Sequence, residues 1–141
     1  MRVTRHPIRK LAAIYAGGVA GALLRVGLAR AFPPAAGTWP WPTFVVNLLG
    51  AFLLGFFFAL FRDHPEEGLH YPFFAPGICG TLTTFSTLQL ELYDLVDEGD
   101  GGLAAGYLAA TLTAGYLLLR LGIALESRWP QRSREPLEEL G

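Results

Sequence analysis

The residues best suited to chemistry lie in one segment, residues 79–91, which reads Cys-Gly-Thr-Leu-Thr-Thr-Phe-Ser-Thr-Leu-Gln-Leu-Glu. Its hydroxyl groups sit within an otherwise apolar run, because residues 71–90 contain no charged residue. Every backbone polar group in lipid needs a hydrogen-bond partner, so a Gly/Thr-rich segment preceded by Pro76 predicts a broken helix that is buried in protein or lines a wet cavity. Such breaks hold the ion and substrate sites of transporters. The segment therefore indicates a pore or a transporter.

Other kinds of site find little support in the sequence. Cys79 is the only cysteine, so it has no internal disulfide partner, and one thiol does not make a metal site. The three histidines, at positions 6, 64 and 70, show no ligand spacing. The sequence has no glycine-rich phosphate loop, nucleophile elbow or carboxylate pair in a polar setting. We therefore expect neither an enzyme nor a protein that binds nucleotides or nucleic acid.

The composition predicts an all-α membrane protein. Of the 141 residues, 52% are hydrophobic and only 16% are charged, whereas soluble domains carry about a quarter charged residues. A helix needs roughly 20 apolar residues to cross the hydrocarbon core. Four segments meet this requirement, at about 11–32, 42–61, 71–94 and 102–125. We expect a single four-span domain, its third helix broken near the middle, with short polar tails at 1–10 and 126–141.

The distribution of Lys and Arg predicts the orientation in a cell membrane. Eight of these residues lie before the first span, between the second and third spans, or after the fourth span, and these three regions share one side. The opposite side carries only Arg30. Because Lys and Arg favour the cytoplasm, we expect both termini to be cytoplasmic. A cleaved signal peptide is the competing interpretation, but Arg25 and Arg30 interrupt the run that it requires.

Several polar side chains within the spans leave two interpretations open. Asn47 either bonds to a neighbouring helix or offers the two hydrogens of its NH2 group to an anion. Glu91 either is a solvated charge near the interface or guards a vestibule. Tyr107, Thr111 and Gly115 recur at every fourth position on one helical face. That face either packs, with its hydroxyls bonded to carbonyls one turn earlier, or borders a narrow passage.

The first span and the connection after it predict close packing and a turn. Gly17 and Gly21 would let another helix approach closely, which ordinary packing explains. Arg25 is costly in lipid unless it snorkels to the interface or forms a structural pair. Prolines exclude a continuous helix over residues 33–42, and the tryptophans there suit the headgroup belt. Thr43 is expected to cap the second span.

Three motifs resemble those of the Fluc/CrcB fluoride channels. Residues 17–25 read Gly-Gly-Val-Ala-Gly-Ala-Leu-Leu-Arg, residues 43–50 read Thr-Phe-Val-Val-Asn-Leu-Leu-Gly, and residues 77–87 read Gly-Ile-Cys-Gly-Thr-Leu-Thr-Thr-Phe-Ser-Thr. The third motif is long and specific, and the order, spacing and four-span length agree. The resemblance covers about residues 14–125, so the chain is identified as a member of this family.

The resemblance implies an antiparallel dimer with two narrow pores along the subunit interface, through which fluoride leaves the cell passively and its toxicity is reduced. Asn47 would supply an amide donor and Phe85 the edge of its ring. Further pore positions are implied for Thr84, Ser86, Thr87, Glu91, Tyr107 and Thr111. Structural positions are implied for Arg25 and Gly77, and for a sodium ion at the dimer centre held by the backbone carbonyls of Gly80 and Thr83.

Two departures from the family pattern concern the pore and the partner. Leu88 stands where the family usually has a second Phe, and Gly115 replaces a second hydroxyl of the fourth span. Some members insert in both orientations and form homodimers, which requires little Lys/Arg bias, whereas the bias here is strong. We therefore favour a heterodimer with a related chain of opposite bias over a homodimer that tolerates it.

Two rival functions remain. A small multidrug-type exporter is also a short four-span antiparallel dimer, but it needs a carboxylate in the first span, and this chain has none there. A non-conducting or half-active subunit that supports a partner is the alternative that Leu88 and Gly115 keep open.

Overall fold

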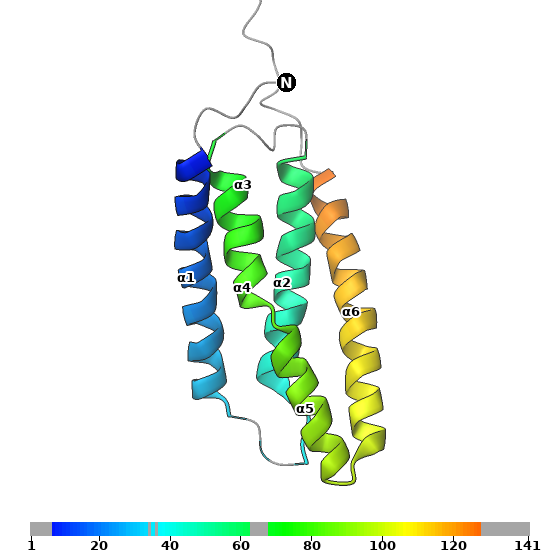
Figure 1. Ribbon diagram of the computed structural model, residues 1–141. Helices are drawn as coiled ribbons and strands as arrows, with labels where there is room; N and C mark the ends of the chain where they lie inside the picture. Colours follow the sequence, from blue (N-terminus) through cyan, green and yellow to red (C-terminus); the bar gives the residue numbers. More distant parts are fainter. Residues whose placement is uncertain (1–6, 34, 36, 63–67, 128–141) are drawn as a thin grey trace, which may run out of the picture.

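The computed structural model describes residues 7–33, 35, 37–62 and 68–127, which form helices and connecting turns with no strand among them. Three helices are long and apolar enough to cross a membrane: α1 (Pro7–Ala31), α2 (Trp41–Leu60) and α6 (Gly101–Ser127). They overlap the expected spans 11–32, 42–61 and 102–125, and lie alongside a fourth, segmented stretch (Figure 1). Most of the expected tails, 1–10 and 126–141, lie outside the described residues.

The expected third span, 71–94, is divided into segments. The short helix α3 (His70–Pro72), the π-helix η1 (Phe73–Cys79) and the short helix α4 (Gly80–Leu82) follow one another directly. Two residues separate α4 from α5 (Phe85–Asp97). Pro76 does not end the helix, because it lies in the wider turns of η1 and has no N–H that needs a partner. The chain becomes extended only at Thr83 and Thr84, with ψ angles of 151° and 121°.

This change of direction takes the chain from one side of the bundle to the other. The segments before it pack against α1, whereas α5 packs against α6 (Figure 1). The extended pair therefore lies where the segmented stretch passes in front of α2. The residues around it face α2 and α6 together, which is the arrangement that positions the site described below.

Glycines set the close approach between the helices. A Cβ atom on Gly17 would collide with the carbonyl oxygen of Phe73, and one on Gly21 would collide with the carbonyl oxygen of Ile78. The expected packing role of these two glycines is thus confirmed. Thr81 adds a hydrogen bond across the same contact, because its hydroxyl donates to the Gly18 carbonyl at 2.8 Å. Helices in lipid associate through such close packing, since the hydrophobic effect does not drive them together there.

Helices α2 and α6 approach each other in the same way. A Cβ atom on Gly55 would meet the carbonyl oxygen of Leu119, and one on Gly122 would meet that of Phe52. The expected cap at Thr43 is wrong. Helix α2 begins after Pro40, and the hydroxyl of Thr43 lies inside the first turn, where it bonds to another helix. Proline in this first turn has no N–H, so the helix has less need of a side-chain cap.

The α2–α6 contact gives a prediction for stability. Gly122→Ala should lower the unfolding temperature, because the added methyl group must push α6 away from α2, at a cost of about 1–3 kcal/mol. Gly106→Ala is the matched control, since the same methyl group at Gly106 meets nothing within 4 Å and alanine favours the helix. Thermal unfolding in detergent, followed by loss of the monodisperse peak, measures both. Equal midpoints for the two variants would contradict the close approach of α2 and α6.

Candidate functional site

Asn47 holds the extended residues between α4 and α5 in place. Its side-chain oxygen accepts the Thr84 backbone N–H at 2.8 Å, and its side-chain nitrogen donates to the Thr84 carbonyl at 3.1 Å. One side chain from α2 thus satisfies both backbone groups of Thr84, as a neighbouring strand would. The amide uses one of its two N–H hydrogens for this purpose, and the other remains available.

Hydroxyl groups gather at the start of α5. The Thr84 hydroxyl is the N-cap: it accepts the Thr87 backbone N–H at 3.2 Å and donates to the Thr87 hydroxyl at 3.0 Å. It also lies 3.3 Å from the Ser86 hydroxyl. This cap stabilises a helix whose first turn contains no acidic residue, so the partial positive charge of the N-terminus is not neutralised by a carboxylate.

The interruption also redirects two amides. In a continuous helix, the N–H groups of Thr84 and Thr87 would donate to the carbonyls of Gly80 and Thr83. Here the first donates to Asn47 and the second to the Thr84 hydroxyl. The Gly80 carbonyl and the Thr83 carbonyl therefore lose the donors that a helix would give them. Backbone oxygens in this state are suitable ligands for a hard cation.

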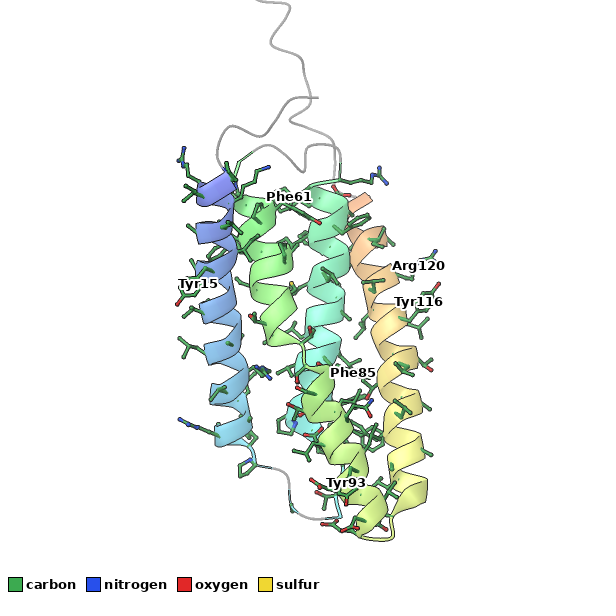
Figure 2. The ribbon with its side chains drawn as sticks, viewed as in Figure 1. Tyr15, Phe61, Phe85, Tyr93, Tyr116 and Arg120 are labelled. Carbon is green, nitrogen blue, oxygen red and sulfur yellow. The ribbon has the colours of Figure 1, made fainter. Side chains whose placement is uncertain are left out.

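An open groove of about 400 Å³ adjoins the interruption. It runs between α2, the start of α5 and α6, and no charged side chain lines it. Phe85, labelled in Figure 2, is 70% exposed beside it. The lining residues are Asn47, Ala51, Leu54, Thr83, Thr84, Phe85, Leu88, Thr111, Leu112, Gly115, Tyr116 and Leu119.

Glu91 lies outside this groove in a network that joins three helices. Its carboxylate accepts the Thr43 hydroxyl of α2 at 2.6 Å and the Tyr107 hydroxyl of α6 at 2.7 Å. Thr43 and Tyr107 are both buried, and Glu91 is partly buried. Glu91 is thus a hydrogen-bonded residue between helices rather than a freely solvated charge.

A second cavity, of about 270 Å³, lies between the end of α1 and the start of α2. Arg25 and Arg30 line it together with Thr43, Thr84 and Thr87. The Nε atom of Arg25 is buried and has no hydrogen-bond partner among the described residues. Through this atom Arg25 adopts neither of the two arrangements left open above, a structural pair or exposure at the interface. Thr84 borders both cavities.

The structure brings most of the predicted residues together in two places. Asn47, Thr84, Phe85 and Thr111 line the groove, and Glu91 and Tyr107 form the network. Thr83 also lines the groove, and Arg25 and Gly80 are placed above. The remaining three candidates have other surroundings, described next.

Ser86 is exposed, Thr87 lines the second cavity but not the groove, and Gly77 packs against the backbone of Gly17. The Thr111 hydroxyl donates to the Tyr107 carbonyl at 2.7 Å, one turn earlier, as the packing interpretation expected.

Thr43 is the one residue of the network that the sequence analysis assigned to a different role. Its position four residues before Asn47, on the same helical face, was the available signal.

Comparisons with known proteins agree with the motifs. The family model described as CrcB-like protein, Camphor Resistance (CrcB), matches residues 12–123. A Mycobacterium bovis protein named Fluoride-specific ion channel FluC 1 is 44% identical over 124 residues, which are 87% of this chain and 94% of that protein. Fluoride-specific ion channel FluC 2 of Nocardia farcinica is 40% identical over 84% of this chain and 85% of its own. A Chlorobium luteolum protein named Fluoride-specific ion channel FluC is 36% identical over 88% and 96%, respectively.

The two hydrogen bonds of Asn47 give a prediction for local stability. Asn47→Leu should leave the N–H and C=O groups of Thr84 without partners, at a cost of about 1–3 kcal/mol for each group that stays buried. Hydrogen–deuterium exchange of a peptide covering residues 83–87 should become faster. Leu49→Ala is the control, because Leu49 is an exposed residue of the same helix. Unchanged exchange in Asn47→Leu would show that other groups hold the extended residues.

Proposed function

The chain belongs to the Fluc/CrcB family of fluoride channels, and we propose that it is itself a fluoride-specific ion channel that lets fluoride leave the cytoplasm passively and so protects the cell from its toxicity. The family consists of ion channels rather than enzymes, which supports the expectation of a non-enzyme. The three long apolar helices of this chain support a location in the membrane.

The observation that carries this proposal is the uncharged groove beside Asn47. Fluoride is small and strongly hydrated, so a pore must replace its water with compact donors, yet conduction requires binding weak enough to release the ion. The free N–H of Asn47, the hydroxyl of Thr111 and the positive ring edge of Phe85 are donors of this kind. A lysine or arginine in the groove would hold the ion too tightly.

An inverted partner would convert this open groove into a closed pore. The groove is exposed on one side, and the Phe85 ring is largely uncovered for a residue at the centre of a membrane protein. We propose an antiparallel dimer in which each subunit covers the groove of the other. Each of the two pores would then run along the interface.

We further propose that a structural sodium ion lies where the two interruptions meet. The carbonyls of Gly80 and Thr83 lack their helical donors, Gly80 is exposed, and a Cβ atom there would meet nothing within 4 Å. Four such oxygens, two from each subunit, fit a hard monovalent cation. Its charge would offset the repulsion between anions in the two neighbouring pores.

The identity of the partner depends on orientation. In Figure 1 the start of α1, the end of α2 and the end of α6 lie at one end of the bundle, and the described basic residues Arg9, Lys10 and Arg62 belong to that end. We propose that this side is cytoplasmic and that the bias fixes one orientation. An inverted partner would then be a related chain with the opposite bias. This arrangement accommodates Leu88 and Gly115. If these two residues weaken one of the two pores of the dimer, the other pore would still conduct.

The alternative of a non-conducting subunit has less support. The relatives bear the name of fluoride-specific channels, and none of the names reported above describes a supporting subunit. Leu88 is buried, with 3% of its surface exposed, and packs with Leu95, Ala104 and Tyr107. At this position a leucine therefore contributes to the core as well as to the groove.

Fluoride efflux from liposomes tests the proposed function. The protein, purified with whatever partner it requires, should release fluoride from loaded vesicles and leave chloride behind. Phe85→Leu should slow release by at least about tenfold, the effect of losing about 1.4 kcal/mol of stabilisation from a ring edge that leucine lacks. A fluoride electrode in the external solution measures the rate.

Phe58→Leu provides the matched control for this experiment. Phe58 is half exposed on α2 and does not line the groove, so its replacement should leave the rate unchanged. Equal effects of the two substitutions, or wild-type vesicles that retain their fluoride, would contradict a pore beside Asn47.

Expression without a partner tests the heterodimer separately. If one orientation is fixed, the chain purified alone should give vesicles with little fluoride efflux, and co-expression with a related chain of opposite Lys/Arg bias should restore it. Fast efflux from the chain alone would refute the heterodimer but leave the fluoride channel in place.

A further inference from the structure

A hydrogen bond joins the connection between α1 and α2 to the turn between α5 and α6. The backbone N–H of Gly37 donates to the Glu98 carboxylate at 2.7 Å. Gly37 has a φ of +63°, and a Cβ atom on it would lie 3.2 Å from the Asp100 carboxylate, so glycine suits this position on both counts. The connection is therefore held at a defined place beside α5 and α6.

Two residues after Gly37, the ring of Trp39 lies against the ring of Tyr107. The two rings meet edge to face, with centroids 5.3 Å apart and planes at 75°. Trp39 makes a second contact of this kind with Phe44, also at 5.3 Å. It packs against the buried cluster that contains Tyr107.

The Tyr107 ring is buried in contact with Trp39 and with Phe44. The Tyr107 side chain has 0% of its surface exposed, although its neighbours Ala105 and Gly106 are exposed. Its hydroxyl reaches the Glu91 carboxylate at 2.7 Å. A ring that carries such a hydroxyl must be held in one orientation for the bond to persist, and Trp39 contacts that ring directly.

We propose that Trp39 is a positioning residue for the channel: it holds the Tyr107 ring so that its hydroxyl stays on Glu91. The inference rests on the proposed function for its effect on fluoride, but the positioning itself does not depend on conduction. Trp39 acts through Tyr107 and does not line the groove. Neighbouring Trp41 differs, because it is 61% exposed and its ring contacts are with Trp39 and Phe44.

A double-mutant cycle tests this role. Trp39→Leu should lower fluoride efflux roughly 2- to 10-fold. The loss of an aromatic edge contact should lower the population of the correctly oriented Tyr107 ring by about this factor. Trp39→Phe should retain most of the rate, because it keeps a ring, and Trp41→Leu should resemble wild type. In a Tyr107→Phe background, which has no hydroxyl to position, Trp39→Leu should cause little further loss.

The same four proteins of the cycle should also be compared by thermal unfolding. Coupling between Trp39 and the Tyr107 hydroxyl should appear there as non-additive midpoints, whether or not the vesicles conduct fluoride. Equal losses from Trp39→Leu in both backgrounds, with additive midpoints, would show a merely structural role and overturn the proposal. So would equal effects of Trp39→Leu and Trp41→Leu. Wild-type vesicles without efflux would count against the proposed function, while the midpoints would still decide the role of Trp39.

Discussion

The arrangement depends on the exchange of hydrogen bonds between Asn47 and the backbone of Thr84. An interrupted helix inside a membrane leaves polar groups that lipid cannot satisfy. Asn47 satisfies two of them from α2, so the chain can change direction at Thr83 and Thr84 without unpaired groups on Thr84. The same exchange removes a helical donor from the Gly80 carbonyl and starts α5 beside the groove. One side chain thus links the interruption, the proposed cation ligands and the proposed ion path.

Charged groups lie near this groove but not in it. Glu91 is hydrogen-bonded to hydroxyls of α2 and α6, and Arg25, whose Nε atom is buried, lines the second cavity. Thr84 stands between the groove and that cavity. A positive group at this remove can attract an anion electrostatically, while the neutral groove avoids the strong binding that would stop conduction. In the proposed channel, the positive group would thus attract the ion from outside the path along which the ion passes.

The sequence predicted the long helices, because their signals are local, and it singled out Asn47 and Thr111 as polar residues within the spans. The pore positions of Thr84 and Phe85 were implied by the resemblance to the family. Apolar length indicates a span, and the Gly/Thr-rich motif indicates an interruption. The exact place of the interruption was less accessible: the Gly/Thr-rich segment after Pro76 offers several places for a break, and the chain becomes extended only at Thr83. Thr43 was assigned to a cap because its carboxylate partner, Glu91, lies 48 residues away. Such contacts depend on how the helices pack, which periodicity does not encode.

Most donors around the groove already have internal partners, and this affects how an ion can bind. The Thr111 hydroxyl donates to Tyr107, and the Thr84 hydroxyl donates to Thr87. An anion that recruits either hydroxyl must replace an existing hydrogen bond, so the net gain is a difference between two similar interactions, on the order of 1 kcal/mol. The second N–H of Asn47 and the edge of Phe85 carry no such cost. These two groups should therefore make first contact with the ion, and the hydroxyls should turn toward it only as it passes. In the proposed channel, binding assembled in this way would replace the water of the ion and still release it.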